Sequence, residues 1–171
     1  MSVELRAPER LTGVWTAVPD ASRAAFRVRD KLVGHAAGTI PVRAGTIRVG
    51  PAGDVQFHAG GLDVTGIETG NAHRDRDLRK PHFLAAEGHP TIVVEAGPVT
   101  PGAQGWSASA TVTARGATAP VDLVVTLESA DETSVTVAVT GRLDRTPLGM
   151  KAPTFIVGRF IDLDVRLAFR R

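Results

Sequence analysis

The chain has 171 residues and contains no cysteine and no tyrosine. The lack of cysteine excludes disulfide bonds, thiolate catalysis and zinc sites with cysteine ligands. No stretch of the sequence approaches the ~20 apolar residues that a membrane-spanning helix requires. The first 20 residues carry five charged side chains and lack the apolar core of a signal peptide. We therefore expect a cytoplasmic location.

The chain also lacks a large excess of charge of either sign. The 20 basic and 18 acidic residues leave a formal net charge of +2, although the sequence pI is about 9.7. So small an excess argues against a nucleic-acid partner. The densest charged segment mixes both signs of charge, which is typical of a solvent-exposed face. It contains Arg74, Asp75, Arg76, Asp77, Arg79 and Lys80.

The size and composition predict one globular domain over residues 1–171. Hydrophobic residues make up 43% of the chain and charged residues 22%, values typical of a folded domain. A chain of this length can bury most of its apolar surface around one core. Internal repeats and low-complexity segments are absent.

Alternation of apolar and polar residues with a period of two dominates the chain and predicts half-buried strands. Gly and Pro turns separate these runs, and one polar face per strand favours an antiparallel sheet. The pattern predicts roughly eight strands in a barrel or sandwich. The clearest runs lie at residues 24–28, 92–96, 110–114, 121–127, 135–139 and 161–169.

Three segments depart from this pattern. Residues 54–67 change parity at Gly60 and Gly61, which predicts one long bent strand with a β-bulge. Residues 96–105 are rich in Gly, Pro and Ala and predict a surface loop. Residues 66–90 form an irregular polar block, in which Asn71 could cap a helix of about two turns ending before Pro81.

Candidate catalytic and metal-binding residues are few. His73, His82 and His89 lie in the irregular block, but their spacing matches no common metal-binding motif. No serine has a G-x-S-x-G context, and no Gly-rich phosphate loop is present. We therefore predict no catalytic residue, no metal site and no cofactor.

The block resembles the middle of the YceI-like family. The resemblance rests on the string G-I-E-T-G-N, then Arg74-Asp75, residues 77–83 and the H-P-T-I of residues 89–92. Residues 20–28, 38–47, 113–121 and 146–150 are similar to further patterns of the family. The similarity spans roughly residues 14–169.

This resemblance implies an all-β fold: an elongated, lipocalin-like, eight-stranded antiparallel β-barrel with one or two short helices. It also implies that a polyisoprenoid or related long apolar chain binds inside. The chain departs from the family pattern at five positions, where we expect the ligand preference to differ, above all at Gly66, Asp77 and Leu84. Where the family usually has His, Ser, His, Phe and Phe, this chain has Ala21, Gly66, Asp77, Leu84 and Val94.

A small barrel must fill its interior with side chains or with a ligand. Only 5% of the residues are aromatic, and the thin Val, Ala and Ile side chains of the apolar faces leave room for a tunnel. We predict that the block closes one end, tied by Thr69, Arg74 and Asp75, with Leu78 and Phe83 turned inward. The predicted ligand-binding residues are Phe26, Val28, Ile40, Phe57, Ile67, Leu78, Phe83, Ile92, Val94, Leu123, Val125, Val137 and Phe155.

The leading hypothesis is binding, transport or storage of an isoprenoid or isoprenoid-quinone-type lipid without catalysis. Two alternatives stay open at this stage. One is a small-molecule enzyme or stress-response effector that uses the His-bearing block of residues 66–90. The other is an interaction module with a fully packed core. Homodimer formation and transient membrane contact are also compatible with the sequence.

Overall fold

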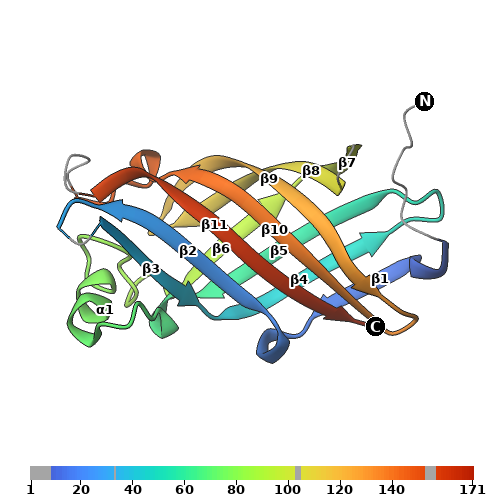
Figure 1. The fold of residues 1–171 in the computed structure, drawn as a ribbon, viewed down its shortest axis with the longest axis horizontal. Helices are drawn as coiled ribbons and strands as arrows, with labels where there is room; N and C mark the ends of the chain where they lie inside the picture. Colours follow the sequence, from blue (N-terminus) through green and yellow to red (C-terminus); the bar gives the residue numbers. More distant parts are fainter. Residues whose placement is uncertain (1–8, 33, 103–104, 153–156) are drawn as a thin grey trace.

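The computed structural model describes residues 9–32, 34–102, 105–152 and 157–171. Within these residues, eleven strands form one antiparallel sheet that closes on itself (Figure 1). The strands are β1 (Gly13–Ala17), β2 (Arg23–Asp30), β3 (Gly34–Ile40), β4 (Val42–Val49), β5 (Val55–Asp63), β6 (Thr91–Ala96), β7 (Pro98–Gly102), β8 (Gly105–Ala114), β9 (Ala117–Ala130), β10 (Ser134–Asp144) and β11 (Val157–Arg170).

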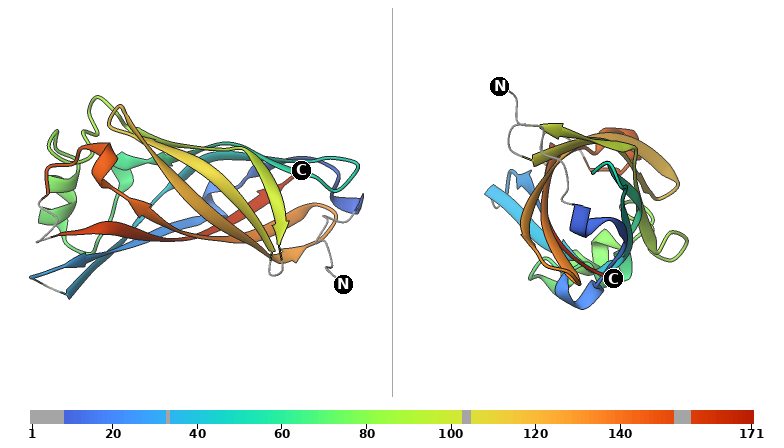
Figure 2. Two further views of the ribbon diagram at one scale, coloured as in Figure 1. Left: turned by 90° about the horizontal axis from the view of Figure 1, so that it is seen from above. Right: turned by 90° about the vertical axis from the view of Figure 1, so that its right-hand side faces the viewer.

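These strands make the predicted eight-stranded barrel because three barrel positions are each divided in two. Strands β1 and β2 both pair with β11 and are separated by η2 (Pro19–Ala21). Strands β3 and β4 pair with β2 and β1 and are separated by Pro41, which cannot donate to a ladder. Strands β6 and β7 both lie between β5 and β8. The barrel is elongated (Figure 1), and the right-hand view of Figure 2 looks along its long axis onto the ring of strands.

The predicted bulge in β5 is present. The register with β4 shifts on both sides of the pair formed by Ala44 and Gly61. The predicted end of this strand at residue 67 is wrong, since β5 ends at Asp63. The chain then forms η3 (Val64–Gly66), where the Asp63 side chain accepts from the Thr65 N–H at 3.0 Å.

The predicted helix is also present, as α1 (Ala72–Leu78), with the Asn71 side chain accepting from the Arg74 N–H at 3.0 Å. The surface loop expected at residues 96–105 is wrong. Strand β7 lies in this segment and pairs with both β5 and β8. The Pro and Gly residues of this segment lower its strand propensity, although a strand tolerates proline at its first residue, the position of Pro98.

The two barrel ends are closed differently (Figures 1 and 2). At one end, residues 64–90 with α1 cover the space between β3 and β6, and η4 (Thr146–Leu148) lies beside them. At the other end lies η1 (Glu9–Leu11), whose Leu11 belongs to the buried core. No helix in the described part of the chain has the length and apolar content needed to cross a lipid bilayer.

Candidate functional site

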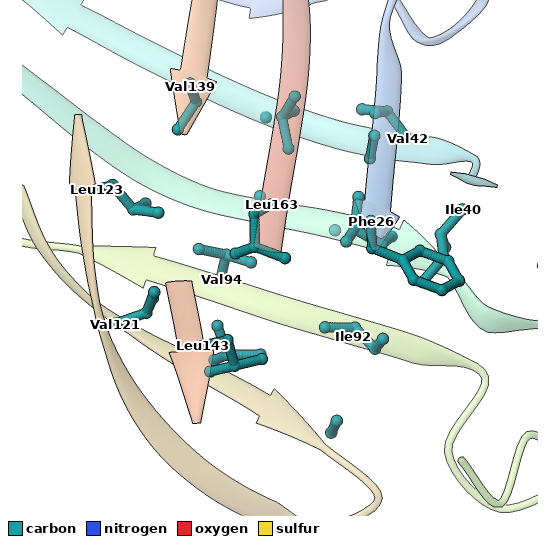
Figure 3. A pocket seen from close by; sticks show the side chains of 18 of the residues that line it. Phe26, Ile40, Val42, Ile92, Val94, Val121, Leu123, Val139, Leu143 and Leu163 are labelled. Carbon is teal, nitrogen blue, oxygen red and sulfur yellow. The ribbon is translucent and has the colours of Figure 1, made fainter. Parts of the chain in front are cut away.

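A large apolar cavity occupies the barrel interior between these two ends, with a volume of about 200 Å³. A single water molecule needs only ~10–15 Å³ of such space. The side chains labelled in Figure 3 come from seven strands and point into the same space. The described lining consists of Ala24, Ala25, Phe26, Ile40, Val42, Ala44, Gly45, Phe57, Gly60, Gly61, Leu62, Ile67, Leu84, Ile92, Val94, Ala96, Val99, Ala108, Val112, Ala114, Val121, Leu123, Val125, Val139, Leu143, Leu148, Met150, Ile161, Leu163, Val165 and Leu167.

The chemistry of this lining is uniform. None of the described lining residues carries a hydroxyl, amide, imidazole or charged side chain. An apolar cavity without polar partners does not hold ordered water well. The site therefore suits a hydrocarbon and offers no side-chain hydrogen bond to a polar group.

Strand alternation positions most of the lining. Along β11, Ile161, Leu163 and Val165 face the cavity, while Asp162 and Asp164 face outward. In β5, Phe57 and Leu62 have opposite parity, yet both line the cavity. The bulge before Gly61 accounts for this, because one extra residue returns the later side chains to the inner face.

Eight of the thirteen sequence-predicted ligand-binding residues line this cavity. Their binding role stays a prediction, whereas their position in the barrel is a property of the structure. Val137 lines a second, smaller cavity instead. Phe155 lies outside the described residues. The eight are Phe26, Ile40, Phe57, Ile67, Ile92, Val94, Leu123 and Val125.

Three further predicted residues line neither cavity. Val28 shares a strand face with Phe26 but lies one step nearer the tip of the hairpin between β2 and β3, past the cavity wall. Leu78 packs against the buried cluster under the block. Phe83 is only partly buried, and the next residue, Leu84, faces inward instead.

Backbone geometry explains why Leu84, and not Phe83, lines the cavity. The Leu84 N–H donates to the Leu78 carbonyl at 2.9 Å, which turns the chain back on the end of α1. Leu84 is consequently buried and part of the cavity wall. Alternation could not predict this direction, because the segment is neither strand nor helix.

Leu143, Leu148 and Met150 are lining residues that the sequence reasoning missed. Extending the alternation of β10 by two steps beyond Val139 would have found Leu143. Leu148 and Met150 lie in and after η4, where no period marks the inner face.

The block is tied down by Asp75, Arg74 and Thr69, as predicted, but through a different arrangement. Arg74 and Asp75 do not pair with each other; both bind Thr69. The Asp75 carboxylate accepts from the Thr69 N–H at 2.8 Å and from its hydroxyl. The Arg74 guanidinium donates to the Thr69 hydroxyl and carbonyl, each at 2.8 Å. Asp75 is 7% exposed, so this carboxylate is a buried anchor.

Strand β3 holds the other side of the block. Thr39 and Glu68 exchange two backbone hydrogen bonds, at 2.8 and 2.9 Å. This contact requires a glycine at position 38, because a Cβ there would lie 2.6 Å from the Glu68 carbonyl oxygen. The irregular segment thus continues the sheet by one bridge.

Arg115 joins the block to η4. Its guanidinium donates to the Pro81 carbonyl at 2.8 Å and to the carbonyls of Leu148 and Gly149. The Lys151 N–H also donates to the His82 carbonyl at 3.0 Å. These contacts span three separate segments, so closure of this end depends on all of them.

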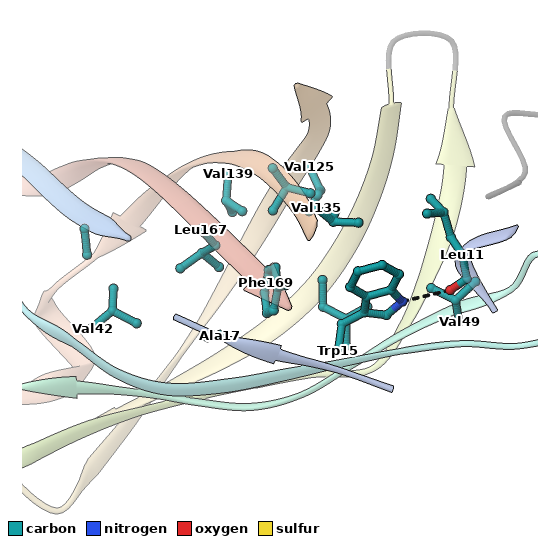
Figure 4. Packing of buried hydrophobic residues seen from close by; sticks show 13 residues of the cluster. Leu11, Trp15, Ala17, Val42, Val49, Val125, Val135, Val139, Leu167 and Phe169 are labelled. Carbon is teal, nitrogen blue, oxygen red and sulfur yellow. Dashed lines mark hydrogen bonds between the residues drawn. The ribbon is translucent and has the colours of Figure 1, made fainter. Parts of the chain in front are cut away.

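The opposite end is a packed plug (Figure 4). The Trp15 indole N–H donates to the Leu11 carbonyl at 2.8 Å, and Phe169 is fully buried beside it. The Arg171 guanidinium lies 4.4 Å from the Trp15 ring centroid, within cation–π range. The same guanidinium donates to three backbone carbonyls. This end is therefore held by both packing and charge-assisted hydrogen bonds.

The histidines of the block lie outside the cavity. His73 is 82% exposed and lies 3.6 Å from the Asp77 carboxylate, while His82 and His89 are exposed. In residues 9–32, 34–102, 105–152 and 157–171, no three His, Asp or Glu side chains converge as metal ligands would.

Charged groups cluster on the barrel exterior. The Arg159 guanidinium and the Thr146 hydroxyl and N–H bind the Asp144 carboxylate and hold its pKa far below the usual range. Hydrogen bonds from Thr133 and Ser134 lower the pKa of Asp131 to about 2. Both carboxylates stabilise turns.

The sequence matches the YceI-like domain over residues 15–170, nearly the whole barrel. The chain belongs to the YceI-like family. None of the curated proteins matches the chain.

Solved structures share this YceI-like fold at low sequence identity. BcnA of Burkholderia cenocepacia is 14% identical, with a TM-score of 0.73 over 89% of this chain and 98% of that one. A polyisoprenoid-binding domain from Saccharophagus degradans, implicated in plant cell wall breakdown, is 15% identical, with a TM-score of 0.69 over 91% and 97%. The YceI protein of Campylobacter jejuni is 14% identical, with a TM-score of 0.65 over 74% and 80%.

The departures of this chain from the YceI-like pattern fall into two groups. Leu84 and Val94, at the two positions where the resemblance implies phenylalanine, line the cavity. Gly66 does not face the cavity; a Cβ there would lie 2.5 Å from the Pro41 ring. Asp77 is paired with Lys80 at 2.8 Å, and Ala21 is exposed in η2. The expected effect on ligand preference therefore concentrates at Leu84 and Val94.

Proposed function

We propose that this protein binds a polyisoprenoid or isoprenoid-quinone-type lipid inside its barrel and carries or stores it without changing it chemically. The observation that carries the proposal is the large cavity whose described lining is apolar throughout. Burying an apolar chain there gains ~0.8 kcal/mol for each CH₂ removed from water.

The cavity chemistry also limits where a polar head group can lie. A hydroxyl or carbonyl buried without a hydrogen-bond partner costs about 1–3 kcal/mol. The lining supplies no side-chain partner, so the enclosed part of the ligand is hydrocarbon and its head group lies towards solvent. The Saccharophagus degradans domain, described as polyisoprenoid-binding, supports this ligand class.

The lining also supports a role without catalysis. General acid–base chemistry and covalent catalysis need an ionisable or nucleophilic side chain within reach of the substrate. The described cavity wall holds none, and the exposed histidines of the block do not belong to it. The enzyme alternative would have to place its reaction outside the cavity.

Organic extraction of protein purified from cells, followed by mass spectrometry, tests the ligand. We expect an isoprenoid lipid at close to one molecule per chain. The double variant Leu84→Phe, Val94→Phe is the matched comparison, because it narrows the cavity with residues that the family itself uses. Recovery of no lipid, or equal recovery from both proteins, contradicts the proposal.

Membrane contact at the block end is part of this proposal, since a carrier must meet its lipid in a bilayer. Leu32 is 85% exposed at the turn between β2 and β3, next to Lys31, and this hairpin projects at the same end as α1 (Figure 1). An exposed leucine beside a cation suits an anionic lipid surface. Co-flotation with phosphatidylserine vesicles should weaken in Leu32→Ser and not in Val124→Ser, which alters a residue 49% exposed on β9.

Homodimer formation and a cytoplasmic location stay predictions. Light scattering coupled to size-exclusion chromatography measures the first, and fractionation of cells measures the second.

A further inference from the structure

The barrel interior contains a second cavity, of about 60 Å³, next to the large one. Phe57, Val99 and Val125 line both cavities. These three side chains therefore lie where the two cavities meet, and we call them the partition.

Phe57 is the largest side chain of the partition, and its position is constrained. Its ring meets the Phe169 ring edge to face, with centroids 6.1 Å apart and planes at 87°. Phe169 is fully buried and cannot yield easily. Phe57 lies before the β-bulge, on the inner face of β5. The aromatic pair therefore lies at the junction of the two cavities.

The smaller cavity lies at the end of the barrel that holds Leu11 and Trp15. Leu11 and Trp15 line it, and Trp15 is 1% exposed and covered by the Arg171 guanidinium. A chain that fills the large cavity from the block end meets Phe57 first and the plug only beyond it. The described residues lining the small cavity are again apolar, apart from the indole N–H groups of Trp15 and Trp106.

We infer that Phe57 sets the longest apolar chain that the barrel accepts. This inference rests on the proposed function and adds the feature that selects among isoprenoid lengths. The hydrocarbon part of a ligand that ends before Phe57 is fully enclosed. A chain one isoprene unit longer must displace an aromatic pair or leave apolar carbons in water.

The substitution Phe57→Ala opens the partition and joins the two cavities. We expect it to raise the length limit by at least one isoprene unit and to tighten binding of the first excluded length at least about tenfold, since each buried methylene favours binding. Leu127→Ala is the matched control, because Leu127 lines only the smaller cavity and its loss leaves the partition intact. Val125→Phe adds a ring to the partition and should shorten the limit.

Binding of all-trans polyprenols of increasing length to the full chain tests the inference. In the wild type, affinity should rise with length and then stop rising; Leu127→Ala should keep that limit and Phe57→Ala should exceed it. An unchanged limit in Phe57→Ala, an equal shift in Leu127→Ala, or no limit in the wild type overturns the assignment. If Phe57→Ala does not fold, Phe57→Leu and Val125→Phe carry the same comparison in smaller steps. Absence of binding at every length would instead refute the proposed function, and the inference with it.

Discussion

The Asp75 carboxylate accepts two hydrogen bonds from Thr69, one from its backbone N–H at 2.8 Å and one from its hydroxyl. Because Asp75 lies in α1 and Thr69 follows the bridge to β3, this contact joins the helix to the barrel wall. A buried carboxylate with two donors anchors the closure of this end.

We expect Asp75→Asn to destabilise the protein by about 1–3 kcal/mol, because a buried donor is left without its charged partner. Amide hydrogen exchange over residues 66–86 should accelerate at the same time. Asp77→Asn is the control on the same helix; its partner Lys80 is more than half exposed, so this substitution should change stability far less than Asp75→Asn. Denaturant unfolding measures both, and equal effects would show that the anchor is not Asp75.

Placing phenylalanine at positions 84 and 94 of the cavity lining should change the bound ligand and not the fold. For Leu84→Phe and Val94→Phe we expect a change in unfolding free energy below ~1.5 kcal/mol, because the added atoms enter existing space. The lipids recovered should shift towards shorter chains or lower occupancy. Val124→Phe, which adds a ring on the barrel exterior, should leave them as in the wild type.

Phe83→Ala offers a second check on the position of the cavity wall. Phe83 is not a lining residue, so the amount and kind of bound lipid should remain unchanged. A changed lipid profile would show that Phe83, and not Leu84 alone, contacts the ligand.

Removing the histidines of the block separates the binding role from the catalytic alternative. The triple variant His73→Ala, His82→Ala, His89→Ala should retain the lipid content of the wild type, because these side chains lie outside the cavity. Loss of lipid binding with intact circular dichroism would favour a ligand site at the block surface.

Acid should weaken the hairpin between β9 and β10 through Asp131. Its pKa is lowered to about 2 in the folded protein by hydrogen bonds from the Thr133 N–H and from Ser134. The folded state therefore binds this proton less tightly than the unfolded chain, and the stabilisation is present above pH ~4 and lost as the pH falls towards 2. Asp131→Asn should lack this part of the pH dependence, and Glu132→Gln in the same turn should keep it. Unfolding midpoints at several pH values and an NMR titration of the carboxyl carbon measure the effect.

Much of this architecture follows from the sequence because strand alternation encodes it directly. The inner faces of β9, β10 and β11 were predictable residue by residue, and the parity change at Gly60 and Gly61 located the bulge. Val28 shows the limit of this reasoning, since alternation predicts a face but not where along the strand the cavity ends.

The closures were less predictable because they depend on contacts between distant segments. The inward turn of Leu84 depends on a hydrogen bond to Leu78. The sequence predicts no more than a turn at Arg115. In the structure its guanidinium donates to the carbonyls of Pro81 and Leu148, each more than 30 residues away along the chain. Both residues lie in segments that resemble the family pattern, but that resemblance does not indicate these contacts, so only the structure reveals them.

Native mass spectrometry of the intact protein mixed with a defined all-trans polyprenol tests the central claim most directly. We predict a single adduct at one polyprenol per chain, with reduced occupancy in the Leu84→Phe, Val94→Phe variant and unchanged occupancy in Val124→Phe. A correctly folded protein that forms no adduct, or that binds equally in all three forms, would contradict an isoprenoid site inside the barrel.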